Sequence, residues 1–404
     1  MKSLLIAHSY LPRVGGRELY LHHVFSRFSA ADLVVLTPYE EGFQSFDRES
    51  SVKIVRVERE RLFWFLRGRR GRLSWFAFLA YLCWRERVDV VHASLAASDG
   101  MSGWLLKQAL GKPYIVYTFG KELTLQPGDL LKRKRLMQVF DQADRVVTIS
   151  DYTRDQLLSL GVPATRIAKI TPGVDTRRFY PDEAAGLAIR ARYQLVDRPV
   201  ILTIGRLVPH KGHDVVIEAL PLILSEIPNV MYLIGGKGPA LEQLQALARE
   251  RDVSDHVIFA GYVPDEELPA FYNAADLFVM PSRQMVEAGE WEGFGIVYLE
   301  ANACGKPVIG GRSGGTEDAI VSGQSGYLVD PESPEAVAEN IVSLLQNPIQ
   351  AQRMGEFGRQ WVQQHRSWEQ AAEQNVSVTA HVLDAHRPRP VSLAHTLSFF
   401  SRRI

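Results

Sequence analysis

Two glutamates eight positions apart, with an arginine and a lysine earlier in the chain, are the residues whose types and spacing could do chemistry. The stretch Glu292-Gly-Phe-Gly-Ile-Val-Tyr-Leu-Glu300 sets a carboxylate on each side of a glycine-flanked phenylalanine. Because a helix is expected from Ile296, the amides of Phe294 and Gly295 would lie at its positively polarised end and suit a phosphate. Carboxylates suit hydroxyl groups, so the stretch predicts a site for a diphosphate joined to sugars. The alternative is an ordinary loop and helix with two solvated glutamates.

Arg206 and Lys211 form the second candidate group, on the loop that follows a predicted strand at 201–204. An arginine fork and a lysine point charge on one loop can neutralise a diphosphate. Gly205 precedes them, and Gly236 lies in a glycine-rich loop after the next strand, where the backbone could pass close to a nucleotide. The alternatives are surface charges and ordinary turn glycines.

The first half of the chain contributes candidates that stand beside predicted strand ends. Gly15 and Gly16 open a helix expected at 19–28, where paired amides suit a phosphate, with a mere tight turn as the alternative. His92 ends a strand, so it could hydrogen-bond a ligand or be structural. The next strand is followed by three more candidates, Phe119, Gly120 and Glu122.

Strand-like runs alternate with helix-like runs along the chain, which is typical of parallel α/β sheets. Several runs are continuously apolar, which indicates burial on both faces. We expect two series of strands with a linker at 171–175 between them: 4–7, 33–37, 53–57, 88–92, 114–118 and 146–149, then 201–204, 230–234, 257–259, 277–280 and 307–310. Two Rossmann-like domains would bind ligands at the carboxyl ends of both sets.

Length and charge limit the class of protein. The chain has 404 residues, enough for two domains with a core in each. Residues 1–170 carry 26 lysines and arginines against 17 acidic residues, and the remainder carries the compensating excess of acid. A basic first half favours an anionic partner such as a membrane surface, a lipid phosphate or a nucleic acid. Two distant cysteines and a short apolar N-terminal stretch predict no disulfide framework, no metal centre and no signal peptide, hence a reducing cytoplasm.

Residues 62–84 combine an aromatic-rich helix with an arginine cluster. Basic residues beside an aromatic helix are typical of an element that lies on a membrane surface. The alternative is a buried helix of the first domain with a solvated arginine loop, because the apolar residues show no single clean face. A nucleic-acid partner is not expected, since no known reader motif accompanies the charges.

Taken together, these strings resemble those of retaining glycosyltransferases of the GT-B type, family 4. The double glycine, the Gly-Arg…Lys-Gly string from Gly205 to Gly212 and the Glu-x7-Glu signature occur in the family's order. The resemblance covers nearly the whole chain. It implies an α/β GT-B fold in which two Rossmann-like domains face a cleft and the last helix crosses back to the first domain. The domains are then expected at 1–172 and 173–365, with the crossing helix at about 366–385 and a loose tail at 386–404.

The resemblance also assigns roles by position. Arg206 and Lys211 would hold the leaving diphosphate, Glu300 the ribose, and Glu292 a sugar hydroxyl. Backbone atoms at Val263 would contact the nucleobase. The residues assigned to donor binding are Gly15, Gly16, Gly205, Arg206, Lys211, Gly236, Val263, Glu292, Phe294, Gly295 and Glu300, and those assigned to the acceptor or sugar side are His92, Phe119, Gly120 and Glu122.

One position departs from the family string, which carries a histidine before the glycine where this chain has Phe119. The family's imidazole lies against the donor sugar, so its loss removes a hydrogen-bonding partner. Either the backbone carbonyl at this position suffices, or turnover is reduced.

The leading hypothesis is a retaining transferase that moves a sugar from a nucleotide-diphosphate donor to a lipid-linked or polysaccharide hydroxyl. The residue types within the motifs favour GDP-mannose as the donor. Arg206, Lys211 and Glu292 are the expected catalytic residues, and no metal or cofactor is expected because two cations neutralise the leaving group. Attack from the face of the leaving group is implied, with Glu292 as a covalent nucleophile as the alternative. The other hypotheses are a phosphorylase or hydrolase on the same scaffold, and a non-catalytic sugar-nucleotide or lipid-binding protein. The expected location is the cytoplasm, at the inner face of the membrane.

Overall fold

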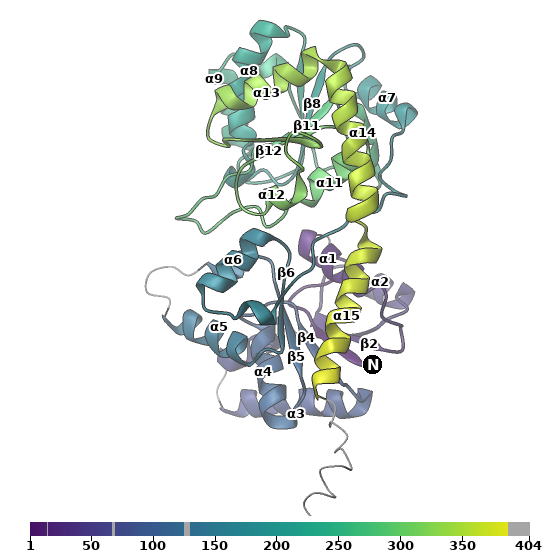
Figure 1. Ribbon diagram of the computed structural model, residues 1–404, viewed down its shortest axis with the longest axis vertical. Helices are drawn as coiled ribbons and strands as arrows, with labels where there is room; N and C mark the ends of the chain where they lie inside the picture. The colour runs from purple at the N-terminus through teal and green to yellow at the C-terminus, as the bar shows by residue number, and fades with distance from the viewer. Residues whose placement is uncertain (14, 67–68, 125–129, 387–404) are drawn as a thin grey trace, which may run out of the picture.

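The computed structural model describes the chain except for residues 14, 67–68, 125–129 and 387–404. Its described part contains two parallel sheets, one in each half of the molecule, with helices on both faces (Figure 1). The first sheet has the order β3-β2-β1-β4-β5-β6-β7 and all its neighbours pair in parallel. Its strands are β1 (Ser3–Ile6), β2 (Leu33–Pro38), β3 (Lys53–Val57), β4 (Val90–Ala93), β5 (Tyr114–Thr118), β6 (Arg145–Thr148) and β7 (Ile167–Lys169).

The second sheet repeats the arrangement with six strands, in the order β10-β9-β8-β11-β12-β13. Its strands are β8 (Val200–Ile204), β9 (Met231–Gly235), β10 (Val257–Gly261), β11 (Leu277–Met280), β12 (Val308–Gly311) and β13 (Gly326–Val329). Every strand expected from the sequence is confirmed to within two residues. The short β7 and β13 at the sheet edges were missed, because no residue of β7 and only two of the four residues of β13 are buried, so neither strand forms a continuous apolar run.

The helices that cover the first sheet are α1 (Gly16–Val24), α2 (Phe43–Glu49), α3 (Arg69–Glu86), α4 (Asp99–Leu110), α5 (Leu130–Gln142) and α6 (Asp151–Ser159). The rest are α7 (Glu183–Arg192), α8 (His213–Glu226), α9 (Leu241–Glu250), α10 (Leu268–Ala274), α11 (Ile296–Ala303), α12 (Thr316–Ala319), α13 (Pro334–Gln346), α14 (Pro348–His365) and α15 (Trp368–His386). Three apolar clusters result. One cluster fills the outer face of each sheet, and the third runs continuously from the α1 face of the first sheet to the α11 face of the second.

The last helix crosses back to the first domain, as Figure 1 shows for α14 and α15. The crossing helix expected at about 366–385 begins at Trp368, because the linker passes Arg366 and Ser367 and Val174 pairs with Ser367. Asn375 of α15 then anchors the helix, since Tyr117 donates to its Oδ1 at 2.5 Å and its Nδ2 donates to the Val24 carbonyl at 3.0 Å. The expected tail lies, beyond His386, outside the described residues.

The aromatic-basic segment at 62–84 divides between the core and the surface. Leu62 and Trp75 are buried, with Trp75 only 3% exposed and its indole N–H donating to Ser102 Oγ at 3.1 Å. Trp84 on the opposite face of α3 is 76% exposed. The side chains of 63–69 lie outside the described set. No helix in the described part of the chain is both long and apolar enough to cross a bilayer.

Candidate functional site

A cavity of about 350 Å³ lies at the carboxyl edge of the second sheet, where a Rossmann-like sheet binds its ligand. Ile204 and Gly235, the last residues of β8 and β9, form its floor. Gly15 of the first domain lines the same cavity, so both halves of the chain contribute to it. The predicted donor residues that line it are Gly15, Gly205, Arg206, Gly236 and Val263.

The loop after β8, which contains Gly205, packs tightly against the loop after β9, which contains Gly236. A Cβ on Gly236 would lie 1.8 Å from the Gly205 carbonyl oxygen, and the φ of +150° at Gly236 is itself unsuitable for other residues. Gly236 N–H donates to the Gly261 carbonyl at 2.6 Å, which fixes this loop to the turn after β10. The two loops can therefore approach this closely only because Gly236 lacks a side chain.

The two predicted cations differ in what they contact. Arg206 is exposed at the cavity rim, and its guanidinium makes no hydrogen bond or ion pair with another described residue. Lys211 instead forms an ion pair with Glu292, and both side chains are less than a fifth exposed. The sequence separates these two residues by 81 positions, yet the fold joins the diphosphate loop directly to the first glutamate of the Glu-x7-Glu stretch. A ligand phosphate at Lys211 would therefore change the charge around Glu292.

The helix that begins after this glutamate is α11, which starts at Ile296 and ends at Ala303 as expected. Gly295 caps it at φ +90°, where a Cβ would lie 2.4 Å from the Tyr298 ring. No side chain caps the helix, so its first N–H groups remain available to a ligand. Phe294 is buried in the core and holds the loop in place.

Glu300 lies one turn into α11 and accepts a hydrogen bond from the Tyr272 hydroxyl at 2.6 Å. Burial raises the pKa of Glu300 to about 7, while the bond from Tyr272 and the charge of Arg178 oppose that rise. Arg178 in turn pairs with Asp265, which lines the cavity. The carboxyl is therefore poised to change its charge near neutral pH.

On the acceptor side, Phe119 and Glu122 form a compact loop. Glu122 accepts a hydrogen bond from the Phe119 amide at 2.6 Å, and burial raises the pKa of the Glu122 carboxyl. The Phe119 ring packs edge-to-face on Tyr20, with centroids 5.4 Å apart. Its carbonyl oxygen faces Gly293 of the second domain, where a Cβ would lie only 2.7 Å away. The structure thus brings this loop and the Glu292 stretch together.

His92 is not brought to the cleft, so its expected place on the acceptor side is corrected. Its side chain is completely buried against the rings of Phe25, Phe28 and Tyr117, and burial lowers its pKa to about 3. Nδ1 lies 3.0 Å from the Tyr117 hydroxyl and Nε2 lies 3.3 Å from Ser3 Oγ. The imidazole is a neutral part of the network that anchors α15.

Sequence reasoning missed a hairpin that closes one side of the cleft. We call residues 283–291 the cleft hairpin; Met285 and Glu290 pair within it. Trp291 contacts the first domain, because a Cβ on Gly120 would lie 2.6 Å from its Nε1 and its ring lies 5.7 Å from that of Tyr152. In the sequence this segment stands out only by its acidic residues, and these do not predict a contact between the two domains.

Tyr262 was also missed, although it is the exposed aromatic of the turn that contains Val263. It is 62% exposed, lines the donor cavity and lies under the Lys237 ammonium at 5.8 Å. An aromatic face at a cavity rim suits a nucleobase.

Among the described residues, no group of three or more His, Cys, Asp or Glu side chains gathers as metal ligands do.

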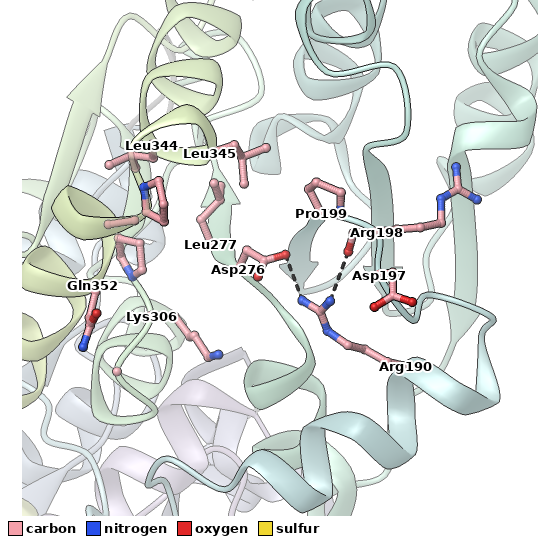
Figure 2. Close-up of a pocket in the computed structure, with 14 residues that line it drawn as sticks. Arg190, Asp197, Arg198, Pro199, Asp276, Leu277, Lys306, Leu344, Leu345 and Gln352 are labelled. Atoms are coloured by element: carbon pink, nitrogen blue, oxygen red, sulfur yellow. Dashed lines mark hydrogen bonds and ion pairs between the residues drawn. The ribbon is translucent and has the colours of Figure 1, made fainter.

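Two larger cavities, of about 470 and 660 Å³, lie at the opposite edge of the second sheet. They adjoin the starts of β8, β11 and β12 rather than their ends. Figure 2 shows that Arg190 reaches Asp276 and the Arg198 carbonyl there, with Lys306 on the facing side. Cavity volume alone therefore does not locate the donor site.

Comparison with known proteins supports this arrangement. The family described as Glycosyl transferases group 1 matches residues 188–361, and the family Glycosyltransferase Family 4 matches residues 14–178. A relative from Mycolicibacterium smegmatis, named GDP-mannose-dependent alpha-(1-6)-phosphatidylinositol monomannoside mannosyltransferase, is 35% identical over 90% of this chain and 94% of its own. A Corynebacterium glutamicum relative, named as acting on the monoacylated form of that lipid, is 30% identical over 93% and 97% of the two chains.

Solved structures show the same fold. The Anabaena protein HepE in complex with UDP and glucose has a TM-score of 0.80 at 18% identity, over 94% of this chain and all of its own. Sucrose-phosphate synthase from Thermosynechococcus elongatus has a TM-score of 0.76 at 23% identity, over 95% of this chain and all of its own. With two parallel sheets facing a cleft, both family matches and relatives that span nearly the whole chain, this protein belongs to glycosyltransferase family 4 and is a glycosyltransferase with the GT-B fold.

Proposed function

We propose that the protein transfers mannose from GDP-mannose to a hydroxyl of a lipid-linked acceptor. The observation that carries the proposal is the donor site, where Arg206 lines a cavity at the carboxyl edge of the second sheet and Lys211, on the same loop, forms an ion pair with Glu292. The names of the relatives support the donor and the lipid class, since they are GDP-mannose-dependent enzymes acting on phosphatidylinositol mannosides. A polysaccharide acceptor has no such support.

In this proposal the residues act in order along the donor. Tyr262 and the backbone at Val263 contact the base, and Glu300 accepts hydrogen bonds from the ribose. Arg206 and Lys211 hold the diphosphate and stabilise the negative charge that develops as it leaves, which removes the need for a metal ion. Lys211 then interacts with both the phosphate and Glu292. The Glu292 carboxylate also accepts a hydrogen bond from a hydroxyl of the mannose. Gly15 and Gly16 bring the positive end of α1 to the same phosphates.

We further propose that the anomeric configuration is retained. The ion pair with Lys211 supports an orienting role for Glu292 rather than that of a covalent nucleophile. Phe119 offers its carbonyl oxygen, not an imidazole, to the sugar side of the cleft. The one-bond coupling constant between C1 and H1 of the transferred mannose, measured by NMR, tests retention. A β-mannoside product would contradict it.

Calorimetric titration of GDP and UDP, without added metal, is the experiment that tests the proposed function. We expect GDP to bind at least tenfold more tightly than UDP and the Arg206→Ala/Lys211→Ala variant to lose that binding. Failure of both nucleotides to bind a folded wild-type protein would overturn the assignment. A preference for UDP would support the donor site but would show that the donor is a UDP-sugar and not GDP-mannose.

We propose that the exposed face of α3 docks on an anionic membrane at the cytoplasmic face, where a lipid acceptor is found. Leu73, Tyr81 and Trp84 are exposed on the face opposite the buried Trp75, and Arg70 and Arg85 flank them. An apolar stripe with cations beside it matches an anionic lipid surface. We expect Tyr81→Ser/Trp84→Ser to reduce binding to vesicles containing phosphatidylglycerol, whereas Leu187→Ser on the exposed side of α7 should not. Equal vesicle binding by wild type and the double variant would refute this contact.

A further inference from the structure

The short helix α12 lies on the side of the second domain that faces α6 and contacts the first domain directly (Figure 1). The carboxylate of its Asp318 is only 7% exposed. Oδ2 accepts a hydrogen bond from the Asp151 amide at 2.8 Å, and Oδ1 lies 2.9 Å from the Lys169 ammonium. Asp151 is the first residue of α6 and Lys169 is the last residue of β7, so one carboxylate of the second domain binds two elements of the first.

The carboxylate suits the end of α6 that it meets. The first amides of a helix have no acceptor within the helix, and the positive end of its dipole favours an anion. Ser150 Oγ accepts from the Thr153 amide at 3.2 Å, and Asp318 accepts from the amide of Asp151. Lys169 also pairs with Asp151 at 2.8 Å, so its ammonium lies between two carboxylates. The contact is therefore both charged and directional, and a neutral or shorter side chain at Asp318 would lose part of it.

The turn that leads into α12 supports the backbone of Glu292. Gly314 and Gly315 form this turn, and Gly315 N–H donates to the Glu292 carbonyl at 2.8 Å. A Cβ on Gly314 would lie 2.4 Å from the Glu292 carbonyl oxygen. A Cβ on Gly315 would lie 2.0 Å from the Gly293 carbonyl oxygen. The backbone at Glu292 is thus packed against the turn from which α12, and with it Asp318, continues.

The first domain also contacts the Glu292 segment directly. A Cβ on Gly293 would lie 2.7 Å from the Phe119 carbonyl oxygen and 3.3 Å from the Ile149 side chain. Ile149 comes just before α6, whose first amide is bound by α12. One stretch of the first domain therefore touches the Glu292 segment at one point and α12 at another. The backbone that carries the Glu292 carboxylate is held from both domains.

Asp318 also lies beside the two connections between the domains. Arg366 Nη2 donates to the Asp318 carbonyl at 3.2 Å. The Arg366 carbonyl accepts from the Val174 amide at 2.8 Å, so the linker and the interval between α14 and α15 meet at this point. Rotation of one domain about these connections moves α6 relative to α12. The contact of Asp318 with α6 is therefore specific for one arrangement of the domains.

We propose that Asp318 is a positioning residue for sugar transfer. Its contacts with α6 and Lys169 hold the turn at Gly314 and Gly315, and through that turn the Glu292 carboxylate, in place when the two domains close over the donor. The inference rests on the proposed function, in which Glu292 accepts a hydrogen bond from a hydroxyl of the mannose. The residues assigned to the base and the diphosphate lie on other loops, after β8 and β10. Loss of Asp318 therefore weakens the binding of the sugar and not that of GDP.

Calorimetric titration of the full chain with GDP and with GDP-mannose tests this role. In Asp318→Ala we expect GDP to bind within twofold of wild type and GDP-mannose to bind at least fivefold more weakly. Asp318→Asn should lose less, because its amide oxygen can still accept from the Asp151 amide although the ion pair with Lys169 is gone. Adding Asp318→Ala to Glu292→Gln should change the affinity for GDP-mannose by less than twofold, since the positioned carboxylate is already absent. Glu317→Ala removes an exposed carboxylate from the same helix and is the matched control, with less than a twofold change expected.

Hydrogen exchange measured by mass spectrometry gives a second readout that needs no ligand. Peptides covering 292–296 and 314–318 should exchange faster in Asp318→Ala than in wild type or Glu317→Ala, because the turn loses its attachment to the first domain. Thermal melts establish that each variant is folded.

Two calorimetric results would overturn the positioning role. One is an unchanged affinity of Asp318→Ala for GDP-mannose, and the other is an equal loss of affinity for GDP and GDP-mannose, which would indicate a general defect of the donor site. Unaltered exchange in both groups of peptides would also overturn it. A wild-type protein that binds neither nucleotide contradicts the proposed function separately, and the exchange measurement then decides whether Asp318 holds the Glu292 segment.

Discussion

The loop after β1 and the loop after β8 occupy equivalent places in their sheets, yet their charges are arranged differently. Each follows a central strand and leads into a helix capped by glycine, Gly15 for α1 and Gly212 for α8, without a side-chain bond. Arg17, the second residue of α1, is held by Ser9 of the first loop and by the adjacent Glu18. Lys211 in the second is held by Glu292, from the start of a distant helix.

This difference shows how one scaffold separates two tasks. The second loop shares its cation with the residue that we assign to the sugar, so phosphate binding and sugar orientation are coupled through one ion pair. The cation at the end of the first loop, Arg17, is instead paired with its neighbour Glu18, although Gly15 beside it lines the donor cavity. We therefore expect changes at Lys211 to affect both phosphate binding and sugar orientation, and changes at Arg17 to leave the Lys211–Glu292 pair in place.

The largest expected effect is that of Lys211→Ala. It removes a cation from the diphosphate and leaves the half-buried Glu292 without its partner, so we expect the turnover number to fall by roughly 100-fold or more. The initial rate of mannose transfer from GDP-mannose measures this. Arg249→Ala on the exposed side of α9 is the control for loss of a charge. A fall of less than fivefold for Lys211→Ala would show that the two loops do not differ as described.

A smaller effect is expected from adding a methyl group at Gly236, which is tightly packed, compared with Gly16, which is not. Gly236→Ala would place a Cβ 1.8 Å from the Gly205 carbonyl, so we expect the affinity for GDP to fall by about tenfold. Gly16→Ala meets no atom, so the melting temperature should be unchanged or slightly higher. Calorimetry and thermal melts measure both. Normal GDP affinity in Gly236→Ala would show that the loop after β9 can move away from the Gly205 carbonyl without cost to the donor site.

The smallest effect concerns pH and Glu300. Its pKa of about 7 lies above the ordinary value of 4.5 for a glutamate, so the folded protein binds an extra proton between these values and its stability falls as pH rises through that window. The ribose contact needs the carboxylate, so we expect GDP-mannose affinity to rise by roughly threefold between pH 6 and 8. Glu300→Gln should abolish the rise. A slope that persists in Glu300→Gln would assign it to another group.

Much of the fold and of the donor site follows from local patterns in the sequence. The buried strands were predictable because they are continuous apolar runs bounded by turns, and α11 because Gly295 and Gly305 bracket it. Arg206, Gly236 and Val263 converge because each lies just beyond a neighbouring parallel strand. Strand order alone thus brings residues far apart in sequence to one edge.

What sequence could not supply depends on contacts between distant elements. Nothing local to His92 reveals that Phe25 and Tyr117 enclose it, and nothing local to Trp75 distinguishes it from the exposed Trp84. The contact of Trp291 with Gly120 exists only once the two domains face each other. The Lys211–Glu292 pair was likewise out of reach, because both residues were assigned to ligands separately.

The return of α15 to the first domain means that this chain cannot be divided at its linker. A fragment ending at residue 172 would leave the Tyr117 hydroxyl and the Val24 carbonyl without Asn375, and His23 without the Trp368 ring that stacks on it 4.5 Å away. The acceptor half is thus encoded by two separate stretches of the gene. Independent expression would require fusing residues 366–386 to the fragment or supplying them as a peptide in trans, which makes α15 a natural point for reconstitution from two pieces.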